Sequence, residues 1–320
     1  GQTGTGKSTL LKNFAAQAIE LGSGIAVLDP HGDTVDAVLD LIPPERANDL
    51  IYLNPSDKQW AVGFNFMECD EPDRQMVVES FLGVLYELFD PHRQGIVGPR
   101  FEHAVRNAMH LAMSSPRGAT LVDVVRVLTE PSYARGLLQH VEDPMVRNYW
   151  EQQIPATSDF HRSEVLDYIV SKFSRFTHDA RIRRVLCQQR STFSMREAMD
   201  QRKILLINLS QGLLGAETSR FLGMLVVNRL LAAAFSRADV PLDQREDFLV
   251  VQGRLSKPPG LDILVLQCRV HKPQRADLSL VLGPHGVLEG FIELFPQHVI
   301  PHFRIVAGKH TGLPPLLPTL

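Results

Sequence analysis

The chain has 320 residues, 44% of them hydrophobic and 22% charged, which predicts one large or two modest globular domains with a sizeable core. A net charge of −3 gives no global basic field for nucleic acid, and three widely spaced cysteines (Cys69, Cys187 and Cys268) exclude a disulfide framework and favour a reducing compartment. No apolar run approaches the roughly 18–20 residues of a membrane span, and no signal peptide is visible.

The chain opens on Gly1-Gln2-Thr3-Gly4-Thr5-Gly6-Lys7-Ser8, a complete G-x-x-x-x-G-K-[ST] motif. Its glycines allow the loop to curl so that successive backbone N–H groups point at phosphate oxygens. Lys7 is expected to reach the β- and γ-phosphates of ATP, and the Ser8 hydroxyl to ligate Mg²⁺. The predicted nucleotide-binding residues are Gly1, Thr3, Gly4, Thr5, Gly6, Lys7, Ser8 and Thr9, with Ser8 as the metal ligand. ATP and Mg²⁺ are the expected cofactors.

Apolar residues at helical spacing follow the loop and predict a helix whose N-terminal dipole favours a bound anion. Gly22 and Gly24 are expected to end this helix. Residues 25–28, Ile-Ala-Val-Leu, are then typical of a buried parallel strand. Because the chain begins inside the motif without an initiator Met, we expect it to be a fragment, with the strand that precedes the loop lying upstream.

The predicted strand ends in Asp29-Pro30-His31-Gly32-Asp33. At the carboxyl end of a strand beside the loop, these residues are expected to overlook the nucleotide. Asp29 is a candidate catalytic residue that would hold a Mg²⁺-bound water, and His31 is a candidate for positioning a phosphate. The alternative is an Asx-type turn in which Pro30 and Gly32 act only as turn residues.

A phosphate-binding loop, one helix and a strand ending in D-P-H-G-D resemble the HerA/FtsK-like pumping ATPases, and specifically the TraD/TraG-type coupling proteins of conjugation. The likeness continues through 41–46 (Leu-Ile-Pro-Pro-Glu-Arg), 51–57 (Ile-Tyr-Leu-Asn-Pro-Ser-Asp) and Gly63-Phe64-Asn65, where that family carries G-F-N-P and this chain has Phe66.

This resemblance implies an ATP-hydrolysing DNA translocase that works as a homo-oligomer, a hexameric ring. Its implied partners are DNA and the type IV secretion machinery at the inner membrane. The implied location is cytoplasmic, and any membrane association would depend on segments outside this chain.

From residue 73 to about 200 the pattern changes to successive amphipathic helices, which predict packing surfaces. Thr120, with Asp123 three residues later, predicts a helix N-cap.

The expected fold is α/β, a P-loop NTPase of RecA/FtsK type with a mostly parallel sheet and a helical insertion. The predicted divisions are 1–70 for the first part of the ATPase core, 71–200 for the all-α insertion, and 201–320 for the remainder of the core. The resemblance implies that this insertion corresponds to the all-α subdomain that the coupling proteins carry at their DNA-entry side.

One stretch of the chain is basic, with nine Lys and Arg against three acids between Lys172 and Lys203. Arg183 and Arg184 are candidate catalytic residues, as arginine fingers offered to a neighbouring subunit's ATP. Alternatively, the stretch contacts DNA phosphates, or it is a solvated helix face. The sequence leaves these alternatives open.

Residues 203–209 predict a strongly apolar strand, and a long helix is expected from about Glu217 to Arg237. Asn208 and Ser210 either face the nucleotide or cap the following helix.

The next predicted strand, 247–251, should end in two acids, but this chain has Gln252 and Gly253. Turnover of ATP is therefore not expected of the chain as written. A nucleotide-binding module without catalysis and a protein-secretion ATPase of the same core are the alternatives.

The resemblance covers residues 1 to about 251 and fades beyond them. Residues 254–320 contain 9 of the 21 prolines, which predicts a tail that is divergent or disturbed in its reading frame. Apolar segments at 261–266, 278–282 and 303–306 still predict a strand–helix–strand arrangement.

Overall fold

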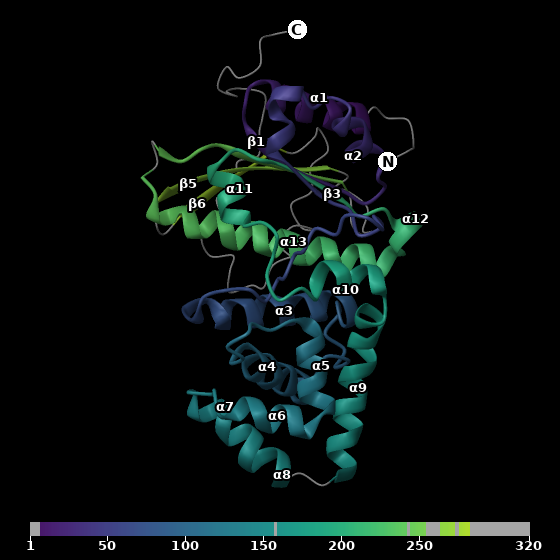
Figure 1. Ribbon diagram of the computed structural model, residues 1–320, viewed down its shortest axis with the longest axis vertical. Coiled ribbons are helices and arrows are strands. Elements are labelled where there is room, and N and C mark those ends of the chain that lie inside the picture. The colour runs from purple at the N-terminus through teal and green to yellow at the C-terminus, as the bar shows by residue number, and fades with distance from the viewer. Residues whose placement is uncertain (1–6, 157–158, 242–243, 254–262, 273–274, 282–320) are drawn as a thin grey trace.

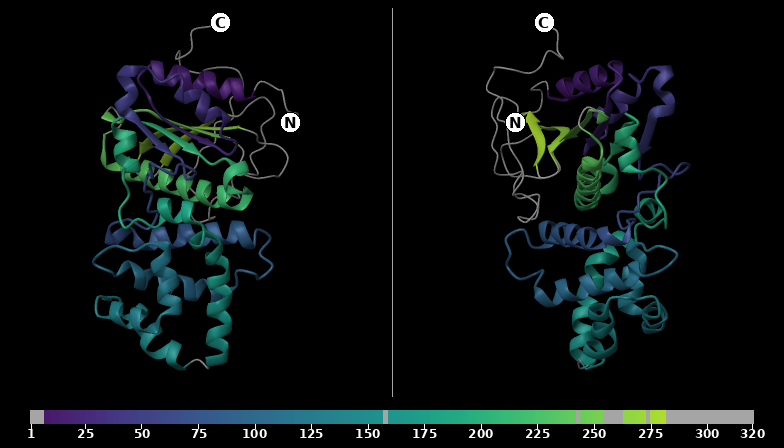
Figure 2. Two further views of the ribbon diagram at one scale, coloured as in Figure 1. Left: turned by 45° about the vertical axis from the view of Figure 1, so that its right-hand side comes forward. Right: turned by 90° about the vertical axis from the view of Figure 1, so that its left-hand side faces the viewer.

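The computed structural model describes residues 7–156, 159–241, 244–253, 263–272 and 275–281. Its strands form one six-stranded sheet, and a body of helices lies at the opposite end of the molecule (Figure 1). The long helix α13 (Ala216–Ser236) lies between these two parts, and Figure 2 shows the same layering from two further sides.

Four strands of the sheet are parallel: β1 (Gly24–Asp29), β2 (Leu50–Leu53), β3 (Ile204–Asn208) and β4 (Phe248–Gly253). The strand order is β2-β3-β1-β4-β5-β6, so β1 is central, and Leu28 pairs with both Ile207 and Gln252. Every residue of β1 is buried, because helices cover both faces, and such strands have continuous apolar sequences. The predicted α/β fold with a mostly parallel sheet and a helical insertion is confirmed.

Successive residues of the central strands face two different cores, as the alternation of side chains in a strand requires. Ile25 and Val27 pack with α1 (Lys7–Glu20) and α2 (Asp33–Leu39) on one face. Ala26 and Leu28 belong to the larger core on the other face, which contains α13. A short 3₁₀ helix, Pro44–Asp49, leads into β2.

The last two described strands differ from the expectation. β5 (Ile263–Lys272) runs antiparallel to β4, and β6 (Arg275–Val281) runs antiparallel to β5. Only two residues separate β5 from β6, whereas a crossover between parallel strands needs about a dozen or more. The predicted strand–helix–strand arrangement is therefore wrong for residues 263–281. The apolar segment at 303–306 lies outside the described residues.

The helical insertion lies between β2 and β3 in the sequence. Its helices are α3 (Arg74–Phe89), α4 (Pro99–Met113), α5 (Leu121–Thr129), α6 (Pro131–Leu138), α7 (Pro144–Asn148), α8 (Ile154–Ala156), α9 (Asp159–Thr177) and α10 (Ala180–Leu186), with a short 3₁₀ turn at Glu71–Asp73 and a π-helical turn at Tyr149–Gln153. The short helix α11 (Met195–Asp200) follows the insertion and packs against α13 and β1, beside the sheet (Figure 1). Thr120 and Asp123 form the predicted capping box at the start of α5.

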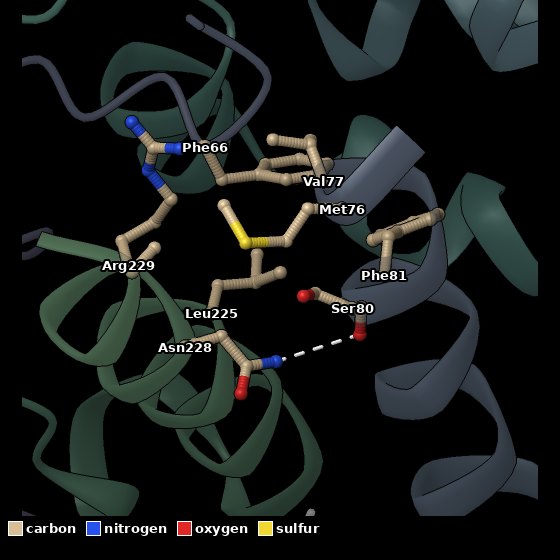
Figure 3. Close-up of a pocket in the computed structure, with 9 residues that line it drawn as sticks. Phe66, Met76, Val77, Ser80, Phe81, Leu225, Asn228 and Arg229 are labelled. Atoms are coloured by element: carbon tan, nitrogen blue, oxygen red, sulfur yellow. Dashed lines mark hydrogen bonds between the residues drawn. The ribbon is translucent and has the colours of Figure 1, made fainter. Parts of the chain in front are cut away.

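Aromatic rings join the insertion to α13. Phe176 of α9 stacks on Phe221 of α13 with ring centroids 3.8 Å apart, and Phe81 of α3 contacts the Phe221 ring edge. A cavity of about 20 Å³ lies beside them between α3 and α13, where Asn228 donates to the Ser80 carbonyl oxygen (Figure 3). It has room for about one water molecule, so we assign it to the packing of this interface.

The chain enters and leaves the insertion at one place. Asn65 is buried there, and its amide nitrogen donates to the carbonyl oxygens of Ala119 at 2.9 Å and Gln189 at 3.0 Å, while its amide oxygen accepts from the N–H of Met67. Thr192 donates from its backbone N–H to the Gly63 carbonyl. The Gly63-Phe64-Asn65 sequence thus fastens the outgoing segment of chain to the returning one.

By length and hydropathy alone, one helix of the described residues could cross a membrane. It is α13 with the turn that follows it, Ala216–Asp239. Most of this stretch is buried against the sheet and the insertion, which is typical of a core helix.

Candidate functional site

Three polar residues meet at one edge of the sheet, where the parallel strands end. Asp29, Asn208 and Gln252 lie at the carboxyl ends of β1, β3 and β4, and all three are buried. Helix α1 runs back along β1, because only a short turn joins its end at Glu20 to Gly24. The N-terminus of α1 therefore lies at this same edge, which is where ligands bind in open α/β sheets.

The predicted phosphate-binding loop leads directly into this helix. Lys7 and Ser8 form the first turn of α1, followed by the exposed Thr9. The first N–H groups of a helix lack an intrahelical acceptor and suit an anion. Gly1, Thr3, Gly4, Thr5 and Gly6 lie outside the described residues, so their predicted role stays a prediction.

The Asp29 carboxylate is bonded within its own turn. Its Oδ1 accepts from the N–H of His31 at 2.9 Å, and its Oδ2 accepts from the N–H groups of Thr34 at 2.7 Å and Val35 at 3.2 Å. It therefore caps α2, whose N-cap residue Gly32 has no side chain to do so. This is the geometry of the Asx-type alternative. The catalytic role predicted for Asp29 stays a prediction, as does phosphate contact by His31, which is exposed.

Asn208 connects the ends of β3 and β2. Its amide oxygen accepts from the N–H of Ser210 at 3.1 Å, and its amide nitrogen lies 3.3 Å from the Tyr52 hydroxyl. Burial raises the pKa of the Tyr52 hydroxyl. Ser210 occupies the N-cap position of α12 (Gln211–Leu214) without a side-chain capping bond.

The end of β4 has no carboxylate to organise a metal. Gln252, only 7% exposed, carries an amide, and Gly253 ends the strand. Asp247 precedes β4 and so lies toward the opposite edge. Within the described ranges, no group of three or more His, Cys, Asp or Glu residues could hold a metal ion. Of the last residues of β1, β3 and β4, only Asp29 therefore carries a carboxylate.

Arg183 and Arg184 lie on α10 of the helical insertion. The Arg183 guanidinium donates to the carbonyl oxygens of Thr177 at 2.7 Å and His178 at 2.8 Å, at the end of α9. Arg184 lies 3.4 Å from the Lys58 carbonyl oxygen, and both arginines line a hollow of about 530 Å³. Their predicted role toward a neighbouring subunit's ATP stays a prediction.

Other arginines of the basic stretch contact the segment that follows β3. Arg175 pairs with Glu217, and Arg181 donates to the Leu213 carbonyl oxygen. The sequence prediction did not single out these residues. They could not be identified from the sequence, because arginines at this spacing also occur on solvated helix faces. Their partners, in addition, are distant in the sequence.

The mostly parallel sheet with helices on both faces, and the N-terminus of α1 at its carboxyl edge, define an α/β fold. Residues 1–85 match the model of the family described as "Helicase HerA, central domain". A comparison with curated proteins found no match.

Among solved structures, the fold is similar to that of a bacterial conjugative coupling protein, TrwBdeltaN70. The unbound monoclinic form has a TM-score of 0.52 and 16% identity, over 78% of this chain and 52% of that one. The trigonal form in complex with sulphate has a TM-score of 0.51 and 16% identity, over 78% and 54%. This chain thus spans about half the length of these proteins. The predicted resemblance to HerA-like ATPases and coupling proteins is confirmed at the level of the fold and of the first 85 residues.

Proposed function

We propose that the chain is the ATP-binding motor core of a coupling protein that moves DNA in conjugative, type IV secretion. The observation that carries the proposal is the carboxyl edge of the sheet, where the complete loop motif leads into α1 beside Asp29, Asn208 and Gln252. The HerA match over 1–85 and the TrwB-like fold support the same class of protein.

In this proposal the first turn of α1 holds the phosphates, and Lys7 neutralises their charge. The Ser8 hydroxyl would hold a Mg²⁺ ion that accompanies the nucleotide and supplies positive charge to its phosphates. Asp29 holds the turn that carries His31 at the rim of the site. Tyr52 and Asn208 fix the neighbouring strand ends.

The wider roles also belong to the proposal. The chain would act as a hexameric ring with other copies of itself, pass DNA toward secretion machinery at the inner membrane, and work on the cytoplasmic side. These roles rest on the match of residues 1–85 to the HerA family model and on the similarity in fold to the coupling protein. We call the carboxyl edge of the sheet, with its proposed nucleotide site, the nucleotide edge.

Titration of this chain with Mg²⁺ and ATP tests the nucleotide site. Lys7→Ala should weaken binding by about 10- to 100-fold, because hydrogen bonds to charged groups contribute about 1.5–3 kcal/mol. Lys12→Ala, on the same helix but beyond its first turn, is the matched control and should bind as the wild type does. Equal affinity in the Lys7→Ala and Lys12→Ala variants would exclude the loop as the phosphate site.

A second function is favoured by Gln252 and Gly253. A site with an amide and a glycine where two acids are expected binds nucleotide without activating a water. The chain would then be a nucleotide-binding module whose turnover is negligible. Steady-state hydrolysis of ATP, measured with and without two acids introduced at the end of β4, separates the two functions.

A further inference from the structure

Side chains of α9 and α10 in the helical insertion contact the chain that follows β3 at the carboxyl edge of the sheet. We call residues 208–217 the edge segment, because they begin at Asn208 on the carboxyl edge and end in the first turn of α13. Arg181 of α10 donates from Nη1 to the Leu213 carbonyl oxygen at 2.5 Å. Arg175 of α9 forms an ion pair with Glu217.

Asp179 orients the Arg181 guanidinium toward the edge segment. Asp179 accepts from Arg181 Nε at 3.0 Å and from Nη2 at 2.7 Å, which leaves Nη1 directed at Leu213. A planar fork of this kind is preorganised, and a lysine would not reproduce it. In contrast, Arg183 directs its Nη1 at the end of its own preceding helix.

The edge segment is in turn bonded to the turn that follows β1. Leu209 donates from its N–H to the Asp29 carbonyl oxygen, and Gln211 donates to the Pro30 carbonyl oxygen, both at 2.9 Å. Gly32 packs beside Asn208, and a Cβ atom added at Gly32 would lie 3.4 Å from Asn208 Oδ1. A displacement of α12 therefore displaces the Asp29–Gly32 turn.

The position of α12 itself depends on its neighbours. It has four residues, is followed by Gly215 with a φ of 82°, and buries Leu214 while Leu213 is 56% exposed. So short a helix has little stability of its own, and its placement is therefore set by what holds it. The insertion holds it from one side and the Asp29–Gly32 turn from the other.

We propose that Arg175 and Arg181 are positioning residues for the bound nucleotide. Arg181 fixes α12, and Arg175 fixes the first turn of α13 that follows it. Through the backbone bonds of Leu209 and Gln211, they also position the Asp29–Gly32 turn beside the predicted phosphates. The inference rests on the proposed nucleotide function. Because coupling between two sites is reciprocal, a nucleotide that orders the edge also fixes α9 and α10 of the insertion.

The test compares the wild-type chain with an Arg175→Ala, Arg181→Ala double variant. Titration with Mg²⁺ and ATP should show affinity lower by about three- to tenfold in the double variant, since each exposed contact contributes modestly. Hydrogen exchange gives the specific readout. Nucleotide should slow exchange at 29–39 and at 175–186 in the wild type, but only at 29–39 in the double variant. Arg135→Ala, an exposed change on α6, should match the wild type in both measurements.

A charge exchange keeps the test decisive if the double variant folds poorly. Arg175→Glu alone should remove the nucleotide-induced protection at 175–186, and adding Glu217→Arg should restore it. The stacked Phe176 and Phe221 rings hold α9 on α13 independently of this ion pair. Unchanged affinity and unchanged protection in these variants would overturn the inference. Absence of nucleotide binding by the wild type would overturn the proposed function and the inference together.

Discussion

Arg46 shows how one side chain holds the edge of the sheet opposite the nucleotide. Its guanidinium donates to the carbonyl oxygens of Ile19 and Ser23 at 3.1 Å and of Arg202 at 2.5 Å. Its Nε binds the Asp49 carboxylate at 3.1 Å. It therefore joins the end of α1, the start of β1 and the entry to β3, and its side chain is 12% exposed.

We expect Arg46→Ala to lower the free energy of unfolding by about 2–3 kcal/mol, because three carbonyl groups and a carboxylate lose a charged donor. Arg46→Lys should recover less than half of this loss, since one ammonium group cannot reach acceptors on three segments. Urea unfolding at pH 7 measures both values. Arg74→Ala, which removes only an exposed pair with Glu71, should change the free energy by less than about 0.5 kcal/mol. Equal losses for Arg46→Ala and Arg74→Ala would contradict the prediction.

The same cluster gives this prediction a pH dependence. The hydrogen bond from Lys203, opposed by burial and aided by Arg46, holds the pKa of Asp49 below its ordinary value of 3.8. A carboxylate whose pKa is lower in the folded state stabilises the protein above its unfolded pKa. This contribution is therefore present above about pH 4 and is lost as the pH falls through the folded pKa. In Arg46→Ala, the stability lost on acidification should be smaller, because Lys203 is then the only one of the two cations left to lower the Asp49 pKa.

At the scale of elements, β4 decides what the site can do. Its apolar sequence predicts a buried strand, and the structure places it beside β1 with Leu28 opposite Gln252. A strand in this position delivers its last side chains to the nucleotide edge. An amide and a glycine at the end of β4 supply neither a carboxylate for the metal nor a base for water.

We therefore expect the chain to show no measurable steady-state ATP hydrolysis above background. Gln252→Asp combined with Gly253→Glu should raise hydrolysis by about 10²–10³-fold, the usual effect of one preorganised polar group in such a site. Gln252→Asn is the matched control, because it alters the side chain without adding a carboxylate. Equal rates in all three proteins would mean that the acids belong elsewhere in the chain.

The elements predicted correctly are those whose patterns are local. The helix after the loop, the strands β1, β3 and β4, and the limits of α13 follow from runs of neighbouring residues. The direction of β5 and β6 was not predictable, because pairing depends on contacts remote in the sequence. The same is true at the site. Asp29 was singled out by its motif, but its capping of α2, and the bond from Arg181 to Leu213 across 32 residues, required the folded chain.

For the whole molecule, the proposed binding of DNA would depend on the charge that the protein surface presents. The net charge is −3, so binding would depend on local basic surfaces such as α10. Arg183 and Arg184 line one hollow together, and both are exposed, which makes them suitable partners for phosphates.

We expect double-stranded DNA to bind with little sequence preference and with affinity that falls steeply as salt is raised. Arg183→Ala with Arg184→Ala should weaken binding and reduce the slope of log K against log salt by about 2, because each arginine would neutralise one phosphate. Arg100→Ala with Arg135→Ala, exposed on α4 and α6, is the control of equal charge. A slope unchanged relative to that control would leave α10 as a solvated face or a source of arginine fingers.

The fastening at Asn65 has a mechanical consequence. A body joined to its base by one flexible link can turn about three axes, whereas two links side by side leave one easy rotation, about the line through both. The outgoing chain near Gly63 and the returning chain near Thr192 are such a pair. The rings of Phe81 and Phe176 on Phe221, together with the contacts of Arg175 and Arg181, oppose that remaining rotation. Breaking the two arginine contacts would remove part of this resistance and leave the packed rings to set the angle between the insertion and the sheet.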